Sequence, residues 1–247
     1  MMLGILLWRE KEPGKGQKAI TLREGKVLHL PVLCAEVLRE NRLPEALLRR
    51  RMLAAAKRLR RAGVKEIILS HGEGGEFLQR LGLEAVSTIP LRQIIAADWV
   101  GVELGKKGIS GAAAQVAVAA PRLTGEVVRT VTELALRYRY VLLDVPQGTE
   151  EFGNRLRRQY GVSLLDGTDR QRDKAQALIL FAPEERPAEN PVVLRLWDPA
   201  VPLPGILLPP MLEERLPAGV DRGQMLSALL RGGALSPGQI CLGTSVT

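Results

Sequence analysis

The clearest periodicity in the chain is a run of apolar residues spaced three or four positions apart between residues 44 and 62. Its members are Leu48, Met52, Ala55, Leu59 and Ala62. This spacing places them on one face of an amphipathic helix. Pro44 suits the first turn of such a helix, and Gly63 is a typical residue just beyond its end. The pattern therefore predicts a helix over 44–62.

Beyond this helix, short apolar runs typical of buried strands alternate with further helical patterns. The expected strands are 66–70, 84–86, 115–120, 140–145, 162–165 and 177–181. The expected helices are 76–81, 91–106 and two whose first turns Thr124 and Thr149 can cap. Strands that alternate with amphipathic helices indicate a mostly parallel sheet with helices on both faces, which is a Rossmann-like α/β fold. We expect 66–70, 115–120, 140–145 and 177–181 to be parallel neighbours in one sheet, buried on both faces.

The two ends of the chain have a different character. The first forty residues predict short strands at 3–7, 19–22 and 26–30, with a turn at Glu24 and Gly25 before the third. Beyond Pro183, frequent prolines surround two apolar runs at 192–196 and 206–208, which suit edge strands or extended arms. A last helix is expected at 222–231, ended by two glycines.

These patterns predict four parts. Residues 1–43 form a small β subdomain packed on the core, and residues 44–111 and 112–183 form two βα halves. The glycine- and alanine-rich stretch 107–114 is the expected joint between the halves. Residues 184–247 form a proline-rich extension that carries the terminal helix.

Composition is that of an ordinary globular protein, with 46% hydrophobic and 25% charged residues. Cys34 and Cys241 lie far apart in the sequence, and we expect both to be reduced. No apolar run approaches the roughly 20 residues of a membrane span, so we expect a cytoplasmic protein without a membrane partner. A homo-oligomer remains open. The formal net charge of +8 favours an anionic partner.

The residues that follow each strand are the first candidates for a site, because ligands of open parallel sheets bind outside the carboxyl ends of the strands. The first such loop contains Ser70, His71, Gly72, Gly74 and Gly75 and leads into a helix. Its glycines would let backbone amides approach a phosphate. Glu73 and Glu76 oppose an anion there, and the dinucleotide fingerprint fails because residue 77 is phenylalanine. A purely structural turn is the alternative.

Two later strands are followed by polar residues of the same kind. Arg122 and Thr124 follow the strand 115–120 and offer a cation, a hydroxyl group and the amides of a helix start. Their alternative roles are a solvated cation and a plain helix cap. Asp144 lies near the end of the apolar strand 140–145, where a carboxylate needs partners. It could bind a ribose hydroxyl, act as a general base, or cap the turn at 147–149.

Catalytic residues cannot be identified from the pattern. His29 and His71 are the two histidines of the chain, and no cysteine or carboxylate cluster has the spacing of a metal site. Ser70 lacks the nucleophile-elbow context, because residue 68 is isoleucine where that motif has glycine. The sequence predicts no metal and leaves any cofactor unknown.

The helix 44–62 suggests a different kind of partner. It carries seven cations opposite its apolar stripe, of which Arg50, Lys57 and Arg61 should point to solvent while Leu48, Met52 and Leu59 are buried. Such a face could bind nucleic acid. A merely solvated helix face is the other interpretation.

The leading hypothesis is an α/β protein that binds a small anionic ligand, such as a nucleotide or phosphorylated metabolite, in a regulatory or accessory role. It requires Gly72, Gly74, Arg122, Thr124 and Asp144 to converge on one pocket at the sheet edge. The alternatives are a nucleotide-dependent enzyme of unknown reaction and a nucleic-acid-binding protein that uses the helix 44–62.

Overall fold

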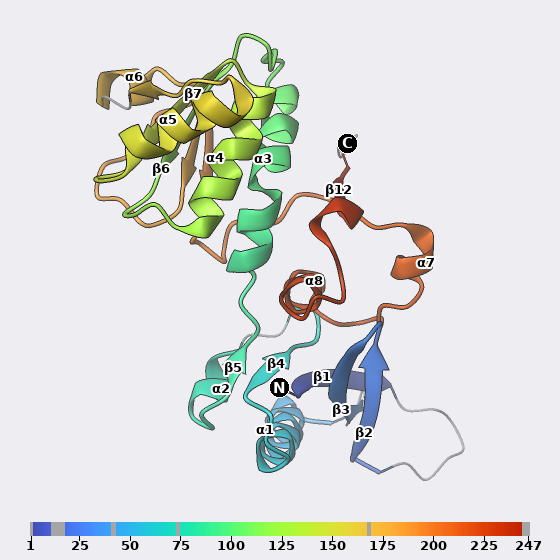
Figure 1. Cartoon of the computed structure of the whole chain (residues 1–247). Helices are drawn as coiled ribbons and strands as arrows, with labels where there is room; N and C mark the ends of the chain where they lie inside the picture. Colours follow the sequence, from blue (N-terminus) through green and yellow to red (C-terminus); the bar gives the residue numbers. More distant parts are fainter. Residues whose placement is uncertain (1, 11–17, 41–42, 73–74, 167–168, 244–247) are drawn as a thin grey trace. The chain divides into compact units, whose positions relative to one another are not determined.

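The structure is a computed structural model that describes residues 2–10, 18–40, 43–72, 75–166 and 169–243 (Figure 1). The chain divides into two compact units. The first unit comprises residues 1–88 and 208–239, and the second comprises residues 89–207 and 240–247. The stretch 107–114 lies within the second unit.

The first unit contains a five-stranded, mostly parallel sheet in the order β2-β3-β1-β4-β5. Its strands are β1 (Leu3–Glu10), β2 (Ile20–Val27), β3 (Leu30–Arg39), β4 (Glu66–Ile68) and β5 (Glu84–Ala85). Only β2 pairs in the antiparallel direction, with β3, among the described strand pairs of this sheet. The helices are α1 (Glu45–Arg61), α2 (Glu76–Gln79), α7 (Pro210–Glu213) and α8 (Arg222–Arg231), followed by the short 3-10 helix η1 (Pro237–Gln239).

Helices cover both faces of this sheet, with α1 and α8 on opposite sides (Figure 1). The buried stripe of α1 packs against the face of the sheet that carries Leu6, Ala35 and Ile67. The predicted helix is confirmed within one residue at each end. Gly63 follows it with a φ of +85°, a left-handed conformation that suits glycine.

The N-terminal strands differ from the prediction. The turn expected at Glu24 and Gly25 is wrong, because both residues lie inside β2, an edge strand whose exposed positions tolerate them. The chain instead turns at Leu28, whose φ is +54°, and β3 then runs on to Arg39. β1 pairs in parallel with both β3 and β4, so these strands form part of the larger sheet.

The second unit contains a five-stranded sheet in the order β10-β9-β6-β7-β8, and all its described pairs are parallel. Its strands are β6 (Gln115–Ala119), β7 (Tyr140–Asp144), β8 (Leu165–Asp166), β9 (Ala177–Leu180) and β10 (Val192–Arg195). The helices are α3 (Ile89–Lys106), α4 (Gly125–Arg137), α5 (Thr149–Tyr160) and α6 (Asp169–Asp173). A separate two-stranded ribbon pairs β11 (Ile206–Leu207) with β12 (Cys241–Leu242).

The chain crosses this second sheet in both directions from β6. It leaves β6 through α4 to reach β7 on one side, and it returns through α6 to β9 on the other side. The strand order therefore reverses between β6 and β9. In open parallel sheets, the carboxyl ends of the strands at such a reversal form the usual ligand crevice.

The predicted α/β class, with mostly parallel sheets flanked by helices, is confirmed. The prediction of one continuous sheet is wrong, because 66–70 contributes β4 to the first sheet whereas β6, β7 and β9 belong to the second. Strand and helix patterns alternate in the same way within both units. The pattern therefore cannot show where one sheet ends and the next begins.

The starts of α4 and α5 in the second unit are capped in different ways. Thr124 caps α4 as predicted, since its side-chain oxygen accepts a hydrogen bond from the amide of Val127. The cap expected of Thr149 is wrong. Gly148 precedes α5 with a φ of +86°, and the Thr149 hydroxyl donates to the carbonyl oxygen of Val145.

Candidate ligand site at the carboxyl edge of the second sheet

The loop that follows β4 in the first unit serves the fold of that unit. Ser70 is buried, and its hydroxyl oxygen accepts a hydrogen bond from the amide of Trp8 at 3.1 Å. The same hydroxyl donates to the carbonyl oxygen of Leu6 at 3.0 Å. Ser70 therefore connects β4 to β1 and presents no hydroxyl group to a ligand.

The backbone of the same loop is joined to a distant segment of the unit. The amide of His71 donates to the carbonyl oxygen of Gly219, and the amide of Asp221 donates to the carbonyl oxygen of Leu69. Ser70 also forms a β-bridge with Val220. These bonds occupy the amide of His71, which is one of the donors that an anion at this loop would need.

The glycines of this loop have structural explanations where they are described. Gly72 is exposed, with a φ of +78° that suits a turn glycine. A Cβ atom on Gly75 would lie 3.2 Å from the Cβ of Ala85, so this position is short of space. Gly74 lies outside the described residues. The helix that follows, α2, has one turn and so offers a weak dipole.

At the edge of the second sheet, Arg122 and Thr124 lie in the loop that joins β6 to α4. Arg122 is exposed, and no hydrogen bond or ion pair of its side chain is found among the described residues. Thr124 is the helix cap, which was one of its two predicted roles. The loop therefore presents a cation without a described hydrogen bond or ion pair beside a helix start.

Glu126 competes for the same helix start. A hydrogen bond to its own backbone amide, another with Thr124 and the nearby charges of Arg129 and Arg122 lower the pKa of the Glu126 carboxyl. A negative group thus already lies where the amides of α4 are exposed. An incoming anion has to displace this carboxylate or bind beside it.

Asp144 ends β7 and takes part in an ion-pair network. Its side-chain oxygen Oδ2 accepts a hydrogen bond from Arg172 Nη1 at 2.9 Å, and Arg172 Nη2 donates to Glu184. Arg172 comes from α6, and Glu184 comes from the loop after β9. The side chain of Asp144 is 35% exposed, whereas that of Arg172 is only 10% exposed. Arg172 therefore holds Asp144 through Oδ2 while leaving part of the carboxylate accessible.

The network fixes the charge of its own cation. Burial lowers the pKa of Arg172, but hydrogen bonds and charges of Glu184 and Asp144 outweigh burial, so the pKa rises overall. The cap of the turn 147–149 expected as one role of Asp144 is not found among the described hydrogen bonds. Sequence analysis missed both Arg172 and Glu184. A carboxylate inside an apolar strand did show that a partner must exist, but not which cation supplies it.

The structure joins only some of the predicted site residues to one sheet edge. Arg122, Thr124 and Asp144 follow neighbouring strands of the second sheet, and the amide of Ala120 donates to the carbonyl oxygen of Asp144 at 3.1 Å. The loop 70–75 follows a strand of the other sheet. The predicted crevice required five residues at one sheet edge. Of these, Arg122, Thr124 and Asp144 share the carboxyl edge of the second sheet.

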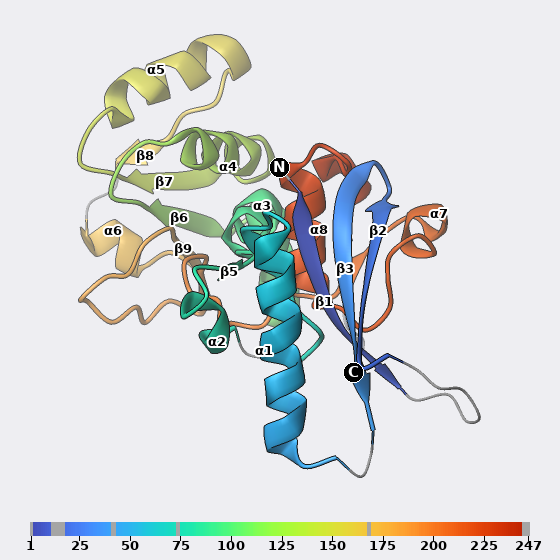
Figure 2. The same ribbon diagram turned by 90° about the horizontal axis from the view of Figure 1, so that it is seen from below.

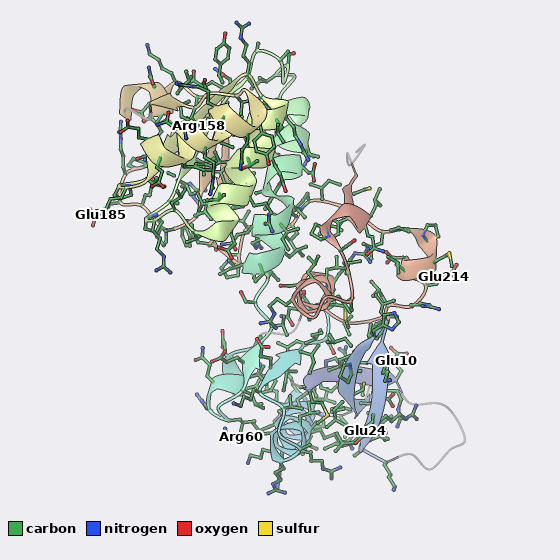
Figure 3. The ribbon with its side chains drawn as sticks, in the orientation of Figure 1. Glu10, Glu24, Arg60, Arg158, Glu185 and Glu214 are labelled. Carbon is green, nitrogen blue, oxygen red and sulfur yellow. The ribbon has the colours of Figure 1, made fainter. Side chains whose placement is uncertain are left out.

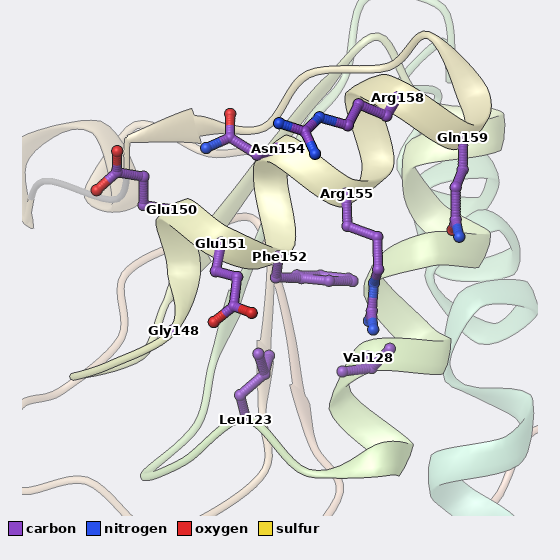
Figure 4. A pocket seen from close by; sticks show the side chains of 10 residues that line it. All are labelled: Leu123, Val128, Gly148, Glu150, Glu151, Phe152, Asn154, Arg155, Arg158 and Gln159. Carbon is purple, nitrogen blue, oxygen red and sulfur yellow. The ribbon is translucent and has the colours of Figure 1, made fainter.

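A groove of about 750 Å³ lies beside this edge, between α4 and α5 (Figure 4). Leu123, Val128 and Phe152 face one another in it, and the Arg155 guanidinium lies 5.2 Å from the ring of Phe152. Its polar residues are Glu150, Glu151, Asn154, Arg155, Arg158 and Gln159. Two glutamates balance two arginines here, so the groove has no preference for an anion. Figure 3 shows Arg158 on α5 and Glu185 in the loop after β9.

The basic helix α1 presents its cations largely as predicted. Arg50, Lys57 and Arg61 are exposed, while Met52 and Leu59 are buried. The expected burial of Leu48 is wrong. That residue, in the first turn of α1, is only partly buried.

Within the part of the chain that the structure describes, no group of three or more His, Cys, Asp and Glu residues is arranged to hold a metal ion. No described helix is both long enough and apolar enough to cross a membrane.

The fold and this edge define an α/β protein whose two mostly parallel sheets are flanked by helices. No family model matches the sequence, and no curated protein matches it. Among solved structures, L-tryptophan dehydrogenase from Nostoc punctiforme is similar over 60% of this chain and 44% of its own, at 11% identity and a TM-score of 0.29. A candidate aspartate carbamoyltransferase from Trypanosoma cruzi is similar over 72% of this chain and 61% of its own, at 13% identity and a TM-score of 0.26. The chain thus spans less than two thirds of either protein, and likeness this low transfers no activity.

Proposed function

We propose that the second unit binds a small phosphorylated ligand with a free hydroxyl group, such as a nucleotide, in a regulatory or accessory role. The observation that carries this proposal is the pairing of opposite chemistry at one sheet edge. Arg122 is an exposed cation without a described partner, and Asp144 is a partly exposed carboxylate at the end of the next strand.

Arg122 supplies the counter-charge for the phosphate. It follows β6, the strand beside the reversal of strand order, and it lies next to the start of a 13-residue helix. A guanidinium group can donate two parallel hydrogen bonds to phosphate oxygens, and the helix start adds partial positive charge. The nearby Glu126 weakens this site without removing the cation.

Asp144 selects the hydroxyl group. It ends the strand that follows β6 in the chain, which is where a carboxylate binds ribose in nucleotide-binding sheets of this order. Arg172 occupies Oδ2 of Asp144, and the structure assigns no partner to Oδ1 among the described residues. A carboxylate oxygen that is held in place accepts a hydrogen bond from a neutral hydroxyl group and repels a second phosphate.

Calorimetric titration with nucleotides and phosphorylated sugars tests the proposal. Arg122→Ala should weaken phosphate binding by about 10- to 150-fold, which corresponds to the 1.5–3 kcal/mol of a charged hydrogen bond. Asp144→Asn should alter the preference between ribose and 2′-deoxyribose ligands. The matched control is Arg139→Ala, because Arg139 is exposed at the opposite end of β7.

The outcomes separate binding from catalysis. Loss of affinity in both Arg122→Ala and Arg139→Ala to the same extent would show that general charge, and not this edge, attracts the ligand. If no phosphorylated compound binds, the proposal is wrong. Conversion of a bound nucleotide to product would instead support the alternative of a nucleotide-dependent enzyme.

A further inference from the structure

The first unit carries almost all the net positive charge of the protein. Its residues include 20 Lys and Arg against 13 Asp and Glu, a formal net charge of +7, whereas the second unit has 15 against 14, a net charge of +1. A charge imbalance of this kind indicates a polyanionic partner for one part of a chain. The imbalance is independent of the ligand site in the second unit.

The outward face of α1 concentrates this charge in a line. Arg50, Lys57 and Arg61 are separated by seven and four residues, which places them within about 40° of one another around the helix axis. They span about 17 Å along the helix at 1.5 Å per residue. Figure 2 shows α1 over its full length. We refer to these three residues as the α1 stripe.

The α1 stripe has no described partners within the protein. Its three side chains are exposed, and none has a hydrogen bond or ion pair among the described residues. Three other cations of the helix have partners, and one of them, Arg58, donates to the carbonyl oxygen of Ile20. Arg49 pairs with Glu45 at 2.8 Å, and Arg51 donates to the carbonyl oxygen of Leu38 at 3.0 Å. The stripe therefore remains available to an external anion.

From this arrangement we infer that the α1 stripe binds the phosphate backbone of a nucleic-acid duplex without reading its sequence. Over about 17 Å a duplex presents about ten phosphates, so three aligned cations find partners on any sequence. The helix carries no aromatic residue, so it offers no stacking platform for the bases of a single strand.

The packing of α1 argues against insertion into a membrane. An interfacial membrane helix exposes a broad apolar face to lipid. The apolar face of α1, including Met52, Ala56 and Leu59, is buried against the sheet of its own unit. Leu47 is the exposed large apolar side chain of the helix among the described residues, so contacts of the outer face are mainly electrostatic, which suits a duplex backbone.

Fluorescence anisotropy with labelled 20-base-pair DNA and RNA duplexes tests this inference on the full chain. Three phosphate contacts predict a slope of about −2.7 for log affinity against log salt, so affinity should fall about 40-fold between 50 and 200 mM salt. Arg50→Gln, Lys57→Gln and Arg61→Gln together should remove most of this binding and flatten the slope. The DNA and RNA arms identify which duplex is preferred.

A second triple variant controls for net charge. Lys26→Gln, Lys107→Gln and Arg215→Gln remove the same number of exposed cations from other surfaces and should leave binding within about twofold. Arg50→Lys with Arg61→Lys keeps the charge of the stripe and should retain binding. Melting curves of all variants should coincide, because the replaced side chains are exposed.

Several results would overturn the inference. Equal loss in the two Gln triples would mean that net charge alone attracts the duplex. Absence of duplex binding by the unaltered chain, or binding to phosphatidylserine vesicles in place of duplex, would also refute it. Because the assay uses nucleic acid, it can fail while nucleotide binding at Arg122 succeeds, and the reverse.

Discussion

The two units use the carboxyl ends of their parallel strands in opposite ways. In the first unit, the loop after β4 gives its backbone groups to Gly219 and Asp221 and its buried serine hydroxyl to β1. In the second unit, the loop after β6 leaves Arg122 exposed, and β7 ends on a partly exposed carboxylate. The richer glycine sequence belongs to the edge that is occupied by its own chain.

The comparison shows that the described glycines of the loop after β4 are explained without a ligand. Gly72 has a positive φ, which suits glycine, and Gly75 lies where a side chain has little space. The loop after β6 has Pro121 and Arg122 in corresponding places, yet it keeps its cation free of described partners. The two units also differ in where their charge lies, since the first unit carries exposed cations on the outer face of α1.

The largest expected effect tests whether the loop after β4 in the first unit has a structural role. Ser70→Ala removes one buried hydroxyl group that bonds two backbone groups, the amide of Trp8 and the carbonyl of the buried Leu6. The first unit should lose about 2–3 kcal/mol of stability, since two hydrogen bonds are lost and the buried carbonyl of Leu6 loses its donor. Hydrogen exchange of the β1 and β4 amides measures this loss within the unit.

Exposed Ser236 in the same unit provides the control, and Ser236→Ala should change stability by less than about 0.5 kcal/mol. Ligand binding at the second edge should be unchanged by either substitution. Reduced nucleotide affinity of a folded Ser70→Ala protein would mean that the first edge is also a ligand site.

A smaller loss is expected from the network that supports the second edge. Arg172→Met keeps most of the side-chain volume but leaves Asp144 and Glu184 without their shared cation. Because both carboxylates are partly exposed, we expect a cost of only about 1–2 kcal/mol. Urea unfolding of Arg172→Met, Glu184→Gln and the double variant measures it, and the double variant should lose less than the sum.

The same variant tests whether Arg172 positions Asp144 for a hydroxyl group. A cation that holds the carboxylate should make the preference for ribose over 2′-deoxyribose depend on Arg172. Arg172→Met should reduce this preference while leaving the contribution of Arg122 intact. An unchanged preference would assign Arg172 a purely structural role.

Elements with their own local signals could be predicted from sequence. The apolar periodicity of α1 and the two glycines after α8 gave bounds within one residue, and the hydroxyl at Thr124 identified a helix cap. The strands β6, β7 and β9 were found because each is a short apolar run between amphipathic helices. These signals act over a few residues and need no tertiary context.

Pairings between distant residues could not be predicted. β4 and β6 have similar patterns, and nothing local shows that they join different sheets. The hydrogen bond from the Asp221 amide to the Leu69 carbonyl connects residues far apart in the chain. The Asp144 partner is set by where α6 crosses the sheet, so one arginine among many in the sequence could not be singled out.

The smallest expected effect concerns the acid at the start of α4, and it is the sharpest test of the second edge. Its backbone hydrogen bond is the main reason that the pKa of Glu126 is lowered from its ordinary value of 4.5. A lowered folded-state pKa means that ionised Glu126 contributes stability above about pH 4.5, and that this contribution is lost as pH falls further. Glu126→Gln should therefore remove a small part of the acid dependence of unfolding while binding phosphate two- to fivefold more tightly at pH 7, because a competing negative charge is gone.

The control is Glu133→Gln, because Glu133 is an acid on the same helix that is further from its start. Calorimetric titration of both variants with phosphate measures the difference. Tighter binding in Glu126→Gln alone would locate the phosphate at the start of α4, whereas equal change in both variants would move the ligand away from Arg122.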